Sequence, residues 1–398
     1  MINPFSMGRL PRIEFGSGAI SHLPAIAARH GRRLLILTGG RSFSASPHWE
    51  GLRKALADGY FGGEIVRITG EPSPEEIDGI VRLSRDGHFD AVIGIGGGSV
   101  LDAAKAVAGL LKPGNSVMDH LEGVGPELPY FGPPTPFIAV PTTAGTGSEA
   151  TKNAVLTRQG PDGFKKSFRN DSLMAEYAIV DPDLLASCPP ALIAANGMDA
   201  LTQLLEAYVS TRANPMTDAL ALAGLAAVRD GLLAWYQGGE GAAAGREKMA
   251  LAALWSGVCL AQAGLGSVHG LAQPLGSFFP IAHGVVCGTL VAAATRINIE
   301  ALRARAPNSP ALAKYAVVGR LLGADPLASD DSARDGLLAT LEEWTRLLQL
   351  PLLSELGVAA GDFPRILAQA RGSSMKTNPI PLHNAEIERI LQMRLLAA

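Results

Sequence analysis

The sequence predicts an α/β domain with a parallel, doubly wound sheet, followed by an all-α helical domain. In the first half, short runs of aliphatic and β-branched residues alternate with segments of helical spacing. From about residue 183 onward, the chain is rich in Ala and Leu at helical spacing. Strands that alternate with helical crossovers of this length favour a parallel sheet with helices on both faces.

The elements of the first domain follow from local patterns. Residues 73–87 are typical of a helix, with Ser73 at the N-cap, Pro74 in the first turn and acidic residues after it. Four runs have the composition and length of buried strands. These runs are 33–38, 90–95, 136–143 and 176–181.

The change of character near residue 183 predicts a domain boundary. The stretch DPDLLASCPP at 181–190 supplies turn-forming residues there. We therefore expect domains at 1–184 and 185–398. Within the second domain, GGEGAAAG at 238–245 is typical of a flexible loop between helices.

Composition and charge limit the partners. Of the 398 residues, 47% are apolar and only 18% are charged, so we expect much buried surface and an oligomer, most simply a homodimer. The net charge of −3 and the lack of a long basic run argue against nucleic-acid binding. Three cysteines without C-x-x-C spacing, Cys188, Cys259 and Cys287, indicate reduced core thiols in a cytoplasmic protein.

A run of 47 residues, 249–295, contains no Asp, Glu, Lys or Arg. Its length raises the question of a membrane span. Glycines, Pro274, Pro280 and polar residues interrupt the run, however. We expect them to break it into short buried helices of a soluble protein that has no membrane partner.

A glycine-rich turn, GIGGGSVLDAAK at 94–105, follows a predicted strand and opens a predicted helix. Backbone N–H groups in such a turn approach a phosphate, and the helix N-terminus adds positive potential. Gly96, Gly97, Gly98 and Ser99 would hold a pyrophosphate, with Asp102 and Lys105 in the first two helical turns. A tight turn that binds no ligand is the alternative.

A second polar loop, PTTAGTGSEAT at 141–151, follows the strand residues PFIAV at 136–140. Open α/β sheets bind ligands at the carboxyl ends of their strands, which is where this loop lies. An ordinary hydroxyl-rich turn is the alternative. Its hydroxyl groups belong to Thr142, Thr143, Thr146 and Ser148.

Three residues of the helical half have the composition of a divalent-cation site. Asp199 lies near the start of a helix that we expect over 197–208, and His269 and His283 lie in the uncharged run. Taken singly, the aspartate has an ordinary explanation as a helix-terminal acid, and each histidine as a core residue. Taken together, a carboxylate and two imidazoles point to a metal ion.

Four motifs, in order, resemble the iron-containing (group III) alcohol dehydrogenases over nearly the whole chain. They are GGGSVLDAAK, PTTAGTGSEAT, GMDALTQLLEAYVS and VHGLAQPLG with the following PIAHG. The resemblance implies the two-domain architecture shared with dehydroquinate synthases. It also implies a nicotinamide coenzyme, NAD or NADP, and a metal ion, Fe²⁺ or Zn²⁺.

The resemblance carries over to individual residues. It implies that Asp199, His269 and His283 bind the metal and serve catalysis. It implies that the coenzyme lies against residues of both polar loops. The pyrophosphate would contact Gly97, Gly98 and Ser99, and the ribose and nicotinamide would lie near Asp102, Thr142, Thr143 and Ser148.

Two positions depart from the family pattern, which usually has histidine at both. Gln203 replaces a metal ligand and has an amide oxygen that reaches about as far, so it could still coordinate, more weakly. Gln273 replaces a residue near the nicotinamide that is not a ligand. An amide cannot shuttle a proton as an imidazole does.

The residues after the strand at 33–38 leave the coenzyme open. Gly39 and Gly40 stand where a carboxylate would favour NAD, and Arg41 follows, so both NAD and NADP are permitted. We expect a metal-dependent alcohol dehydrogenase or aldehyde reductase for a small alcohol or carbonyl compound. The alternatives are a metal-independent maleylacetate reductase-like enzyme, a dehydroquinate synthase-like lyase and a non-catalytic nucleotide-binding protein.

Overall fold

The computed structural model describes residues 4–40, 42–323 and 325–396 of the chain. The chain forms two compact units. An α/β unit comprises residues 8–158 and 165–188, and a helical unit comprises residues 189–396 with the short segments 4–7 and 159–164. Each unit has its own apolar core.

The α/β unit is built on a six-stranded sheet in which every neighbouring pair is parallel. The strand order is β1-β8-β5-β4-β2-β3. The predicted parallel sheet is therefore confirmed. Its strands are β1 (Arg12–Phe15), β8 (Tyr177–Val180), β5 (Phe137–Pro141), β4 (Ala91–Gly96), β2 (Arg33–Thr38) and β3 (Gly62–Arg67).

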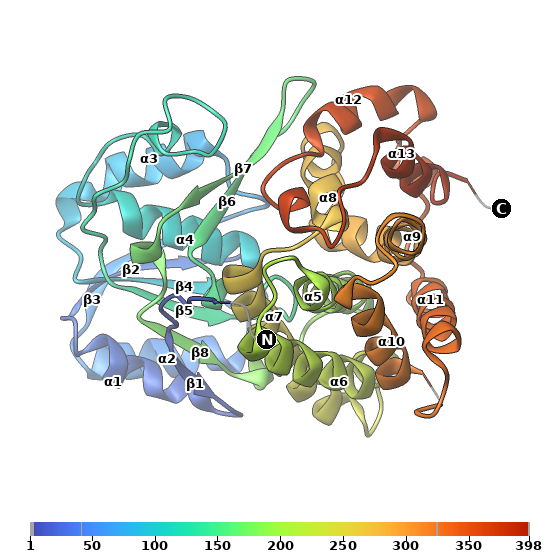
Figure 1. Ribbon diagram of the computed structural model, residues 1–398. Helices are drawn as coiled ribbons and strands as arrows, with labels where there is room; N and C mark the ends of the chain where they lie inside the picture. The colour runs from blue at the N-terminus through green and yellow to red at the C-terminus, as the bar shows by residue number, and fades with distance from the viewer. Residues whose placement is uncertain (1–3, 41, 324, 397–398) are drawn as a thin grey trace. The chain divides into compact units, whose positions relative to one another are not determined.

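Helices cover both faces of this sheet, as expected for a doubly wound fold. In Figure 1, α1 (Leu23–Ala27) and α2 (Pro47–Asp58) lie on one face, and α3 (Pro74–Ser84) and α4 (Gly98–Leu110) lie on the other. The connections from β1 to β2 and from β2 to β3 run towards one edge of the sheet, and those from β3 to β4 and from β4 to β5 run towards the other. Because each crossover is right-handed, the first two place their helices on one face and the last two on the opposite face.

Two kinds of strand were not expected from the sequence. The edge strands β1 and β3 carry mostly exposed or half-buried residues, so they lack the apolar runs of the central strands. A separate pair, β6 (Asn153–Arg158) and β7 (Phe164–Arg169), forms a two-stranded sheet.

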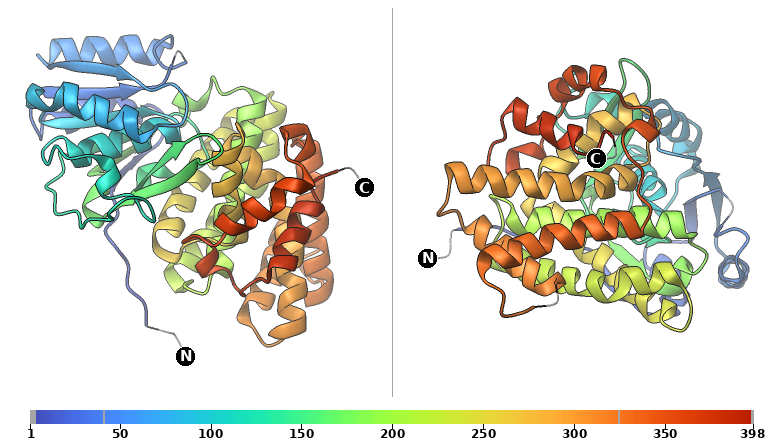
Figure 2. Two further views of the ribbon diagram at one scale, coloured as in Figure 1. Left: turned by 90° about the horizontal axis from the view of Figure 1, so that it is seen from above. Right: turned by 90° about the vertical axis from the view of Figure 1, so that its right-hand side faces the viewer.

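The helical unit is organised around α5 (Pro190–Val209), nearly all of which is buried from Ile193 onward. It packs against α6 (Pro215–Gln237), α7 (Ala242–Ala263) and α9 (His283–Arg305). In the right-hand view of Figure 2, α9 runs beside α11. The remaining helices are α8 (Ser267–Phe278), α10 (Pro310–Leu322), α11 (Asp330–Leu347), α12 (Phe363–Gln369) and α13 (Asn384–Gln392).

Three expectations about this unit were wrong in detail. The helix expected over 197–208 begins at Pro190, so Asp199 lies in its interior and no helix-terminal role explains it. The loop expected over 238–245 is shorter, because α7 begins at Ala242. The uncharged run is not divided into short helices only: α9 has 23 residues, and Pro274 lies inside α8.

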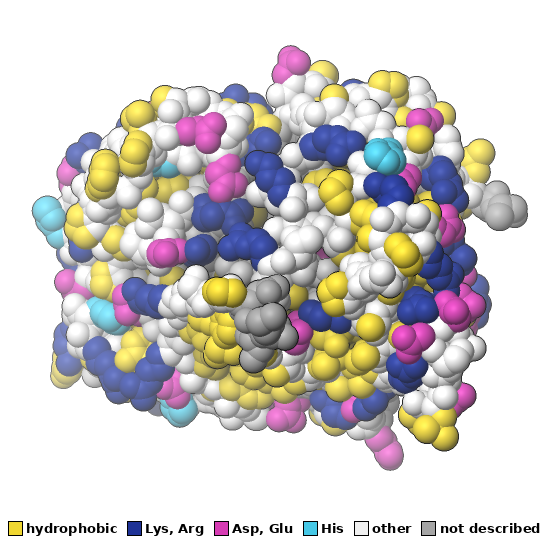
Figure 3. Space-filling view, viewed as in Figure 1, with side chains coloured by type: hydrophobic (Ala, Val, Ile, Leu, Met, Phe, Trp, Pro, Cys, Tyr) yellow, Lys and Arg dark blue, Asp and Glu magenta, His cyan; other side chains and the backbone are white. Residues whose placement is uncertain are grey.

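By length and composition alone, α6 and α9 are apolar enough to cross a membrane. Within the helical unit, 83% of the most apolar stretch of α9 and 44% of that of α6 are buried. The hydropathy of α9 is thus used in packing against neighbouring helices. On the molecular face shown in Figure 3, acidic and basic side chains are interspersed with uncharged ones.

A fully buried cation ties α4 to the segment after β5. The Lys105 side chain is 0% exposed, and burial lowers its pKa to about 8, although Asp102 and Glu149 attract its charge. Its Nζ donates hydrogen bonds of 2.8 Å to Thr151 Oγ1 and to two backbone carbonyl oxygens, those of Ser148 and Asn153.

We predict that Lys105→Met destabilises the protein by about 3–5 kcal/mol, because it leaves two carbonyl groups and a carboxylate buried without their cation. Urea-induced unfolding followed by circular dichroism measures the loss. Lys112→Met, at an exposed lysine just beyond α4, should change stability by less than about 0.5 kcal/mol. Equal unfolding midpoints for Lys105→Met and the wild type would contradict the prediction.

The buried Glu149 gives a pH prediction. Burial raises its pKa to about 7, against the attraction of Lys105, whereas the unfolded value is about 4.3. The folded state therefore holds more protons between these values, and its stability falls as pH rises through this window. Glu149→Gln should reduce that fall, measured as the difference in urea midpoint between pH 5 and 8. Glu64→Gln, at an exposed residue of β3, should leave the wild-type pH dependence unchanged.

Candidate functional site

The two predicted coenzyme loops meet in the α/β unit. Gly97 caps α4, and Gly98 is its first residue. A Cβ on Gly98 would lie 2.6 Å from Thr146 Oγ1, so only glycine allows this approach. The backbone N–H of Thr142 donates to the Gly96 carbonyl at 2.9 Å. The glycine-rich turn and the hydroxyl-rich loop thus form one continuous surface.

An internal hydrogen bond fixes the polar side chains of this surface. Ser148 Oγ donates to Asp102 Oδ1 at 2.5 Å, and Lys105 Nζ lies 3.7 Å from the same oxygen. Burial raises the pKa of the Asp102 carboxyl, while Lys105 and Ser148 favour its charged form. Part of the hydrogen-bonding capacity of Asp102 and Ser148 is therefore already used between these two side chains. The hydroxyl groups of this surface that remain partly accessible are those of the half-buried residues Ser99, Thr142, Thr143 and Thr146.

Gly39 and Gly40 directly follow β2, whose neighbour in the sheet is β4. A Cβ on Gly39 would lie 3.7 Å from Val100 of α4, and a Cβ on Gly40 would meet nothing within 4 Å. Arg41, considered above as a coenzyme contact, lies outside the described residues. The sheet therefore brings Gly39 beside the N-terminal turn of α4.

The helical unit brings together the three predicted metal ligands and a cysteine. The residues come from three helices: Asp199 from α5, His269 from α8, and His283 and Cys287 from α9. One ligand atom from each lies within 4.8 Å of the others. Asp199 Oδ1 is 3.2 Å from His269 Nε2 and 3.7 Å from His283 Nε2.

A buried carboxylate orients His269. Glu206, two helical turns after Asp199 on α5, accepts a hydrogen bond from His269 Nδ1 at 2.6 Å and one from the Val268 backbone at 2.7 Å. Because Nδ1 serves Glu206, Nε2 is the nitrogen that faces Asp199. Carboxylates paired with metal-binding imidazoles in this way raise their basicity and fix their tautomer.

The charges of the cluster are strongly coupled. Burial alone would raise the pKa of Asp199, but the His283 charge and the hydrogen bond from His269 lower it to about 2. Burial opposes a proton on His269, yet Cys287, Glu206 and Asp199 together raise its pKa well above the ordinary value. Burial raises the pKa of the Cys287 thiol to about 12.

Two orphaned oxygen atoms show that the cluster suits a cation. Asp199 is 1% exposed and Gln203 is 2% exposed. Asp199 Oδ2 and Gln203 Oε1 are both buried without a hydrogen-bond partner among the described residues. Unpaired buried acceptors are costly, and a divalent cation would satisfy them. The donor set therefore fits a metal ion of the Fe²⁺ or Zn²⁺ type.

Gln273 lies on α8, one helical turn after His269, and is partly buried. A Cβ on Gly372 would lie 2.6 Å from its Oε1, so the chain passes close to this amide. Gln273 therefore belongs to the same helix as His269.

Two residues of the site were not predicted from the sequence: Cys287, a member of the cluster, and Glu206, which holds His269. Glu206 is seven residues after Asp199, and Cys287 is four after His283, so each shares a helix face with a predicted ligand. This spacing was a usable signal. Cys287 was interpreted as one more core thiol because it lacks a second cysteine nearby in sequence.

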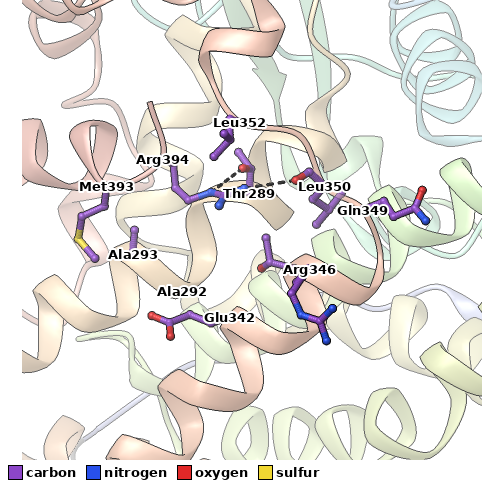
Figure 4. Close-up of a pocket in the computed structure, with 11 residues that line it drawn as sticks. Thr289, Ala292, Ala293, Glu342, Arg346, Gln349, Leu350, Leu352, Met393 and Arg394 are labelled. Carbon is purple, nitrogen blue, oxygen red and sulfur yellow. Dashed lines mark hydrogen bonds between the residues drawn. The ribbon is translucent and has the colours of Figure 1, made fainter. Parts of the chain in front are cut away.

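A separate pocket of about 390 Å³ lies between α9, α11 and the C-terminal segment, lined by residues that include Thr289, Arg346 and Arg394. Figure 4 shows Arg394 hydrogen-bonded to Thr289 and to the Leu350 carbonyl. Arg346 is likewise paired, with Glu343 at 2.7 Å. Because these cations already have partners, we assign the pocket no ligand.

Comparison with known proteins agrees with the geometry of both units. The sequence profile of iron-containing alcohol dehydrogenases matches residues 11–182. The profile of the C-terminal region of the Fe-containing alcohol dehydrogenase family matches residues 193–395. Together the two profiles span most of the chain.

Curated relatives carry alcohol dehydrogenase names. A 1-propanol dehydrogenase of Salmonella typhimurium is 32% identical over 402 aligned residues, which cover 98% of this chain and 99% of that protein. Long-chain-alcohol dehydrogenase 1 of Geobacillus thermodenitrificans is 38% identical, over 69% of this chain and 68% of that protein.

Solved structures share the fold over nearly the whole chain. A 1,3-propanediol oxidoreductase matches with a TM-score of 0.86 and 27% identity, covering 99% of this chain and all of that one (100%). A sulfoacetaldehyde reductase from Bifidobacterium kashiwanohense, solved with NAD⁺, matches with a TM-score of 0.82 and 25% identity, covering 98% and 99% of the two chains. The resemblance noted in the sequence is thereby confirmed, and the chain belongs to the family of iron-containing alcohol dehydrogenases.

Proposed function

We propose that this protein is a metal-dependent, NAD(P)-linked alcohol dehydrogenase that interconverts a small alcohol and its aldehyde. The observation that carries the proposal is the cluster of Asp199, His269 and His283, with Cys287, in the largely buried interior of the helical unit. Names of relatives, including 1-propanol dehydrogenase and 1,3-propanediol oxidoreductase, support a short alcohol as substrate.

The proposed metal ligands are Asp199, His269 and His283, with Gln203 as a further, weaker oxygen donor. When bound, the metal supplies Lewis acidity at the substrate oxygen, and the coenzyme supplies or accepts the hydride. Glu206 holds the His269 ring so that its Nε2 lone pair faces the site. Asp199 and His269 are buried, which strengthens the charge interactions between them, whereas His283 is 24% exposed.

The proposed coenzyme contacts lie in the α/β unit. The backbone N–H groups of Gly97, Gly98 and Ser99 at the start of α4 would bind the pyrophosphate. We infer that Asp102, Thr142, Thr143 and Ser148 lie around the ribose and nicotinamide. Gly39 and Gly40 leave room for an adenosine ribose with or without a 2′-phosphate, so both NAD and NADP remain candidates.

The first test is metal removal. Chelator-stripped protein should oxidise NADH or NADPH with propanal poorly, and added Fe²⁺ or Zn²⁺ should restore the rate, because the substrate oxygen needs a Lewis acid. Initial rates at 340 nm, the absorbance of the reduced coenzyme, measure this. Equal rates with and without metal would instead identify a metal-independent reductase.

The ligand variant for this test is Asp199→Asn, which keeps the shape of the side chain but removes its negative charge. It should abolish restoration by metal while reduced coenzyme still binds, as judged by the coenzyme's fluorescence. Loss of coenzyme binding in Asp199→Asn would show that the substitution acts through folding. Full metal restoration in this variant would contradict the proposed ligand set.

A second test concerns proton transfer. We infer that Gln273 lies near the reacting groups and cannot relay a proton, so a group other than this side chain would have to carry it. Gln273→His should then raise kcat, by up to about 100-fold, and add a titration near neutral pH. Gln273→Leu, which adds no titratable group, should leave the shape of the pH–rate profile unchanged. A Gln273→His profile that matches the wild type would remove Gln273 from the mechanism.

A further inference from the structure

The cysteine beside the metal ligands occupies a position suited to coordination. Cys287 Sγ lies 3.7 Å from His269 Nε2 and 3.7 Å from His283 Nε2. The side chain is 0% exposed, and His283 and Cys287 are one helical turn apart on the same face of α9. The sulfur therefore points to the same small volume as both imidazoles.

Four of the six distances between the ligand atoms are close to the edges of a tetrahedron around zinc. With Zn–S of about 2.3 Å and Zn–N of about 2.0–2.1 Å, tetrahedral geometry separates sulfur from nitrogen by about 3.5 Å, and oxygen from nitrogen by about 3.4 Å. The corresponding separations here are 3.7 Å for both sulfur–nitrogen pairs, and 3.2 and 3.7 Å for the two oxygen–nitrogen pairs. The unpaired Asp199 Oδ2 independently marks the site as one for a cation.

We propose that the Cys287 thiolate is a fourth protein ligand, and that the site consequently takes Zn²⁺ in preference to Fe²⁺. This inference rests on the metal site of the proposed function. A thiolate is a soft donor. Compared with a site of oxygen and nitrogen ligands only, a site with a thiolate has a stronger preference for zinc. The thiol loses its proton to solvent when the metal binds. Gln203, proposed above as a further donor, has a poorer amide oxygen and is then not required as a ligand. The substrate oxygen would enter as a fifth ligand.

Cobalt spectroscopy tests the proposal without relying on activity. Co²⁺ replaces Zn²⁺ in similar geometry, and thiolate ligation gives an intense charge-transfer absorption in the near ultraviolet that oxygen and nitrogen ligands lack. We expect metal-free protein titrated with Co²⁺ under argon to develop this band and to saturate at one ion per chain. Zn²⁺ added afterwards should remove it.

Two serine variants assign the band. Cys287→Ser should bind Co²⁺ without developing the charge-transfer band. Its affinity for Co²⁺ should fall by at least about tenfold, because losing even a group that only supports a ligand costs that much. Cys259→Ser, at a buried cysteine of α7 that donates to the Thr217 carbonyl, should keep the band and the affinity. Persistence of the band in Cys287→Ser would overturn the proposal.

The wild-type protein alone also decides the matter if a variant fails to fold. Co²⁺ binding with only weak visible bands would overturn ligation by Cys287 and leave the proposed metal site standing. Absence of any Co²⁺ binding would overturn both. Dialysis of metal-free protein against equal concentrations of Fe²⁺ and Zn²⁺, followed by elemental analysis, should give a higher ratio of zinc to iron in the wild type than in Cys287→Ser, because zinc binds more tightly than iron to most sites even without a thiolate. Equal ratios would overturn the stated effect of the thiolate on metal preference.

Discussion

The interaction on which the candidate site depends is the burial of the Glu206 carboxylate between α5 and the start of α8. Its two oxygens accept hydrogen bonds from the Val268 backbone and from His269 Nδ1, so one side chain fixes both the first turn of α8 and the orientation of the imidazole. The chain must also pass close by, because a Cβ on Gly266 would lie 2.9 Å from Glu206 Oε1. A buried carboxylate without such partners would be costly, so the fold and the tautomer of His269 are determined together.

Helical periodicity explains why so few elements make the site. Asp199, Gln203 and Glu206 recur at intervals of four and three along α5, which gives one helix face a ligand, an unpaired amide oxygen and a positioning carboxylate. His283 and Cys287 repeat the same spacing on α9. Because α5 packs directly against α9, the two faces meet and require only His269 from α8 to complete the cluster. The long apolar helices α5 and α9 therefore position the residues of the site as well as forming the core.

The sequence predicts what depends on apolar periodicity and fails where structure depends on the surroundings. The central strands, such as β2 and β4, are runs of buried residues and were expected within a few positions. The edge strand β3 has no such run, because its side chains are mostly exposed and backbone pairing with β2 forms it. The helix expected over 197–208 begins at Pro190, and Gly197 lies in its interior against Leu232, where a Cβ would come within 2.2 Å of that side chain. Composition alone does not distinguish Cys287 from Cys259. The spacing of four residues from His283 does, and tertiary packing then sets Cys287 beside two imidazoles.

The charge balance of the proposed site depends on Glu206 as well as on the ligands. A divalent cation with the Asp199 carboxylate and neutral ligands carries a net charge of +1, and the buried Glu206 carboxylate beside His269 offsets that charge. A thiolate in place of one neutral ligand then adds a negative charge, so its contribution is donor strength and position and not charge neutralisation. The added negative charge also lowers the Lewis acidity available to the substrate oxygen. A site with the thiolate therefore polarises the substrate less than a site with a third imidazole.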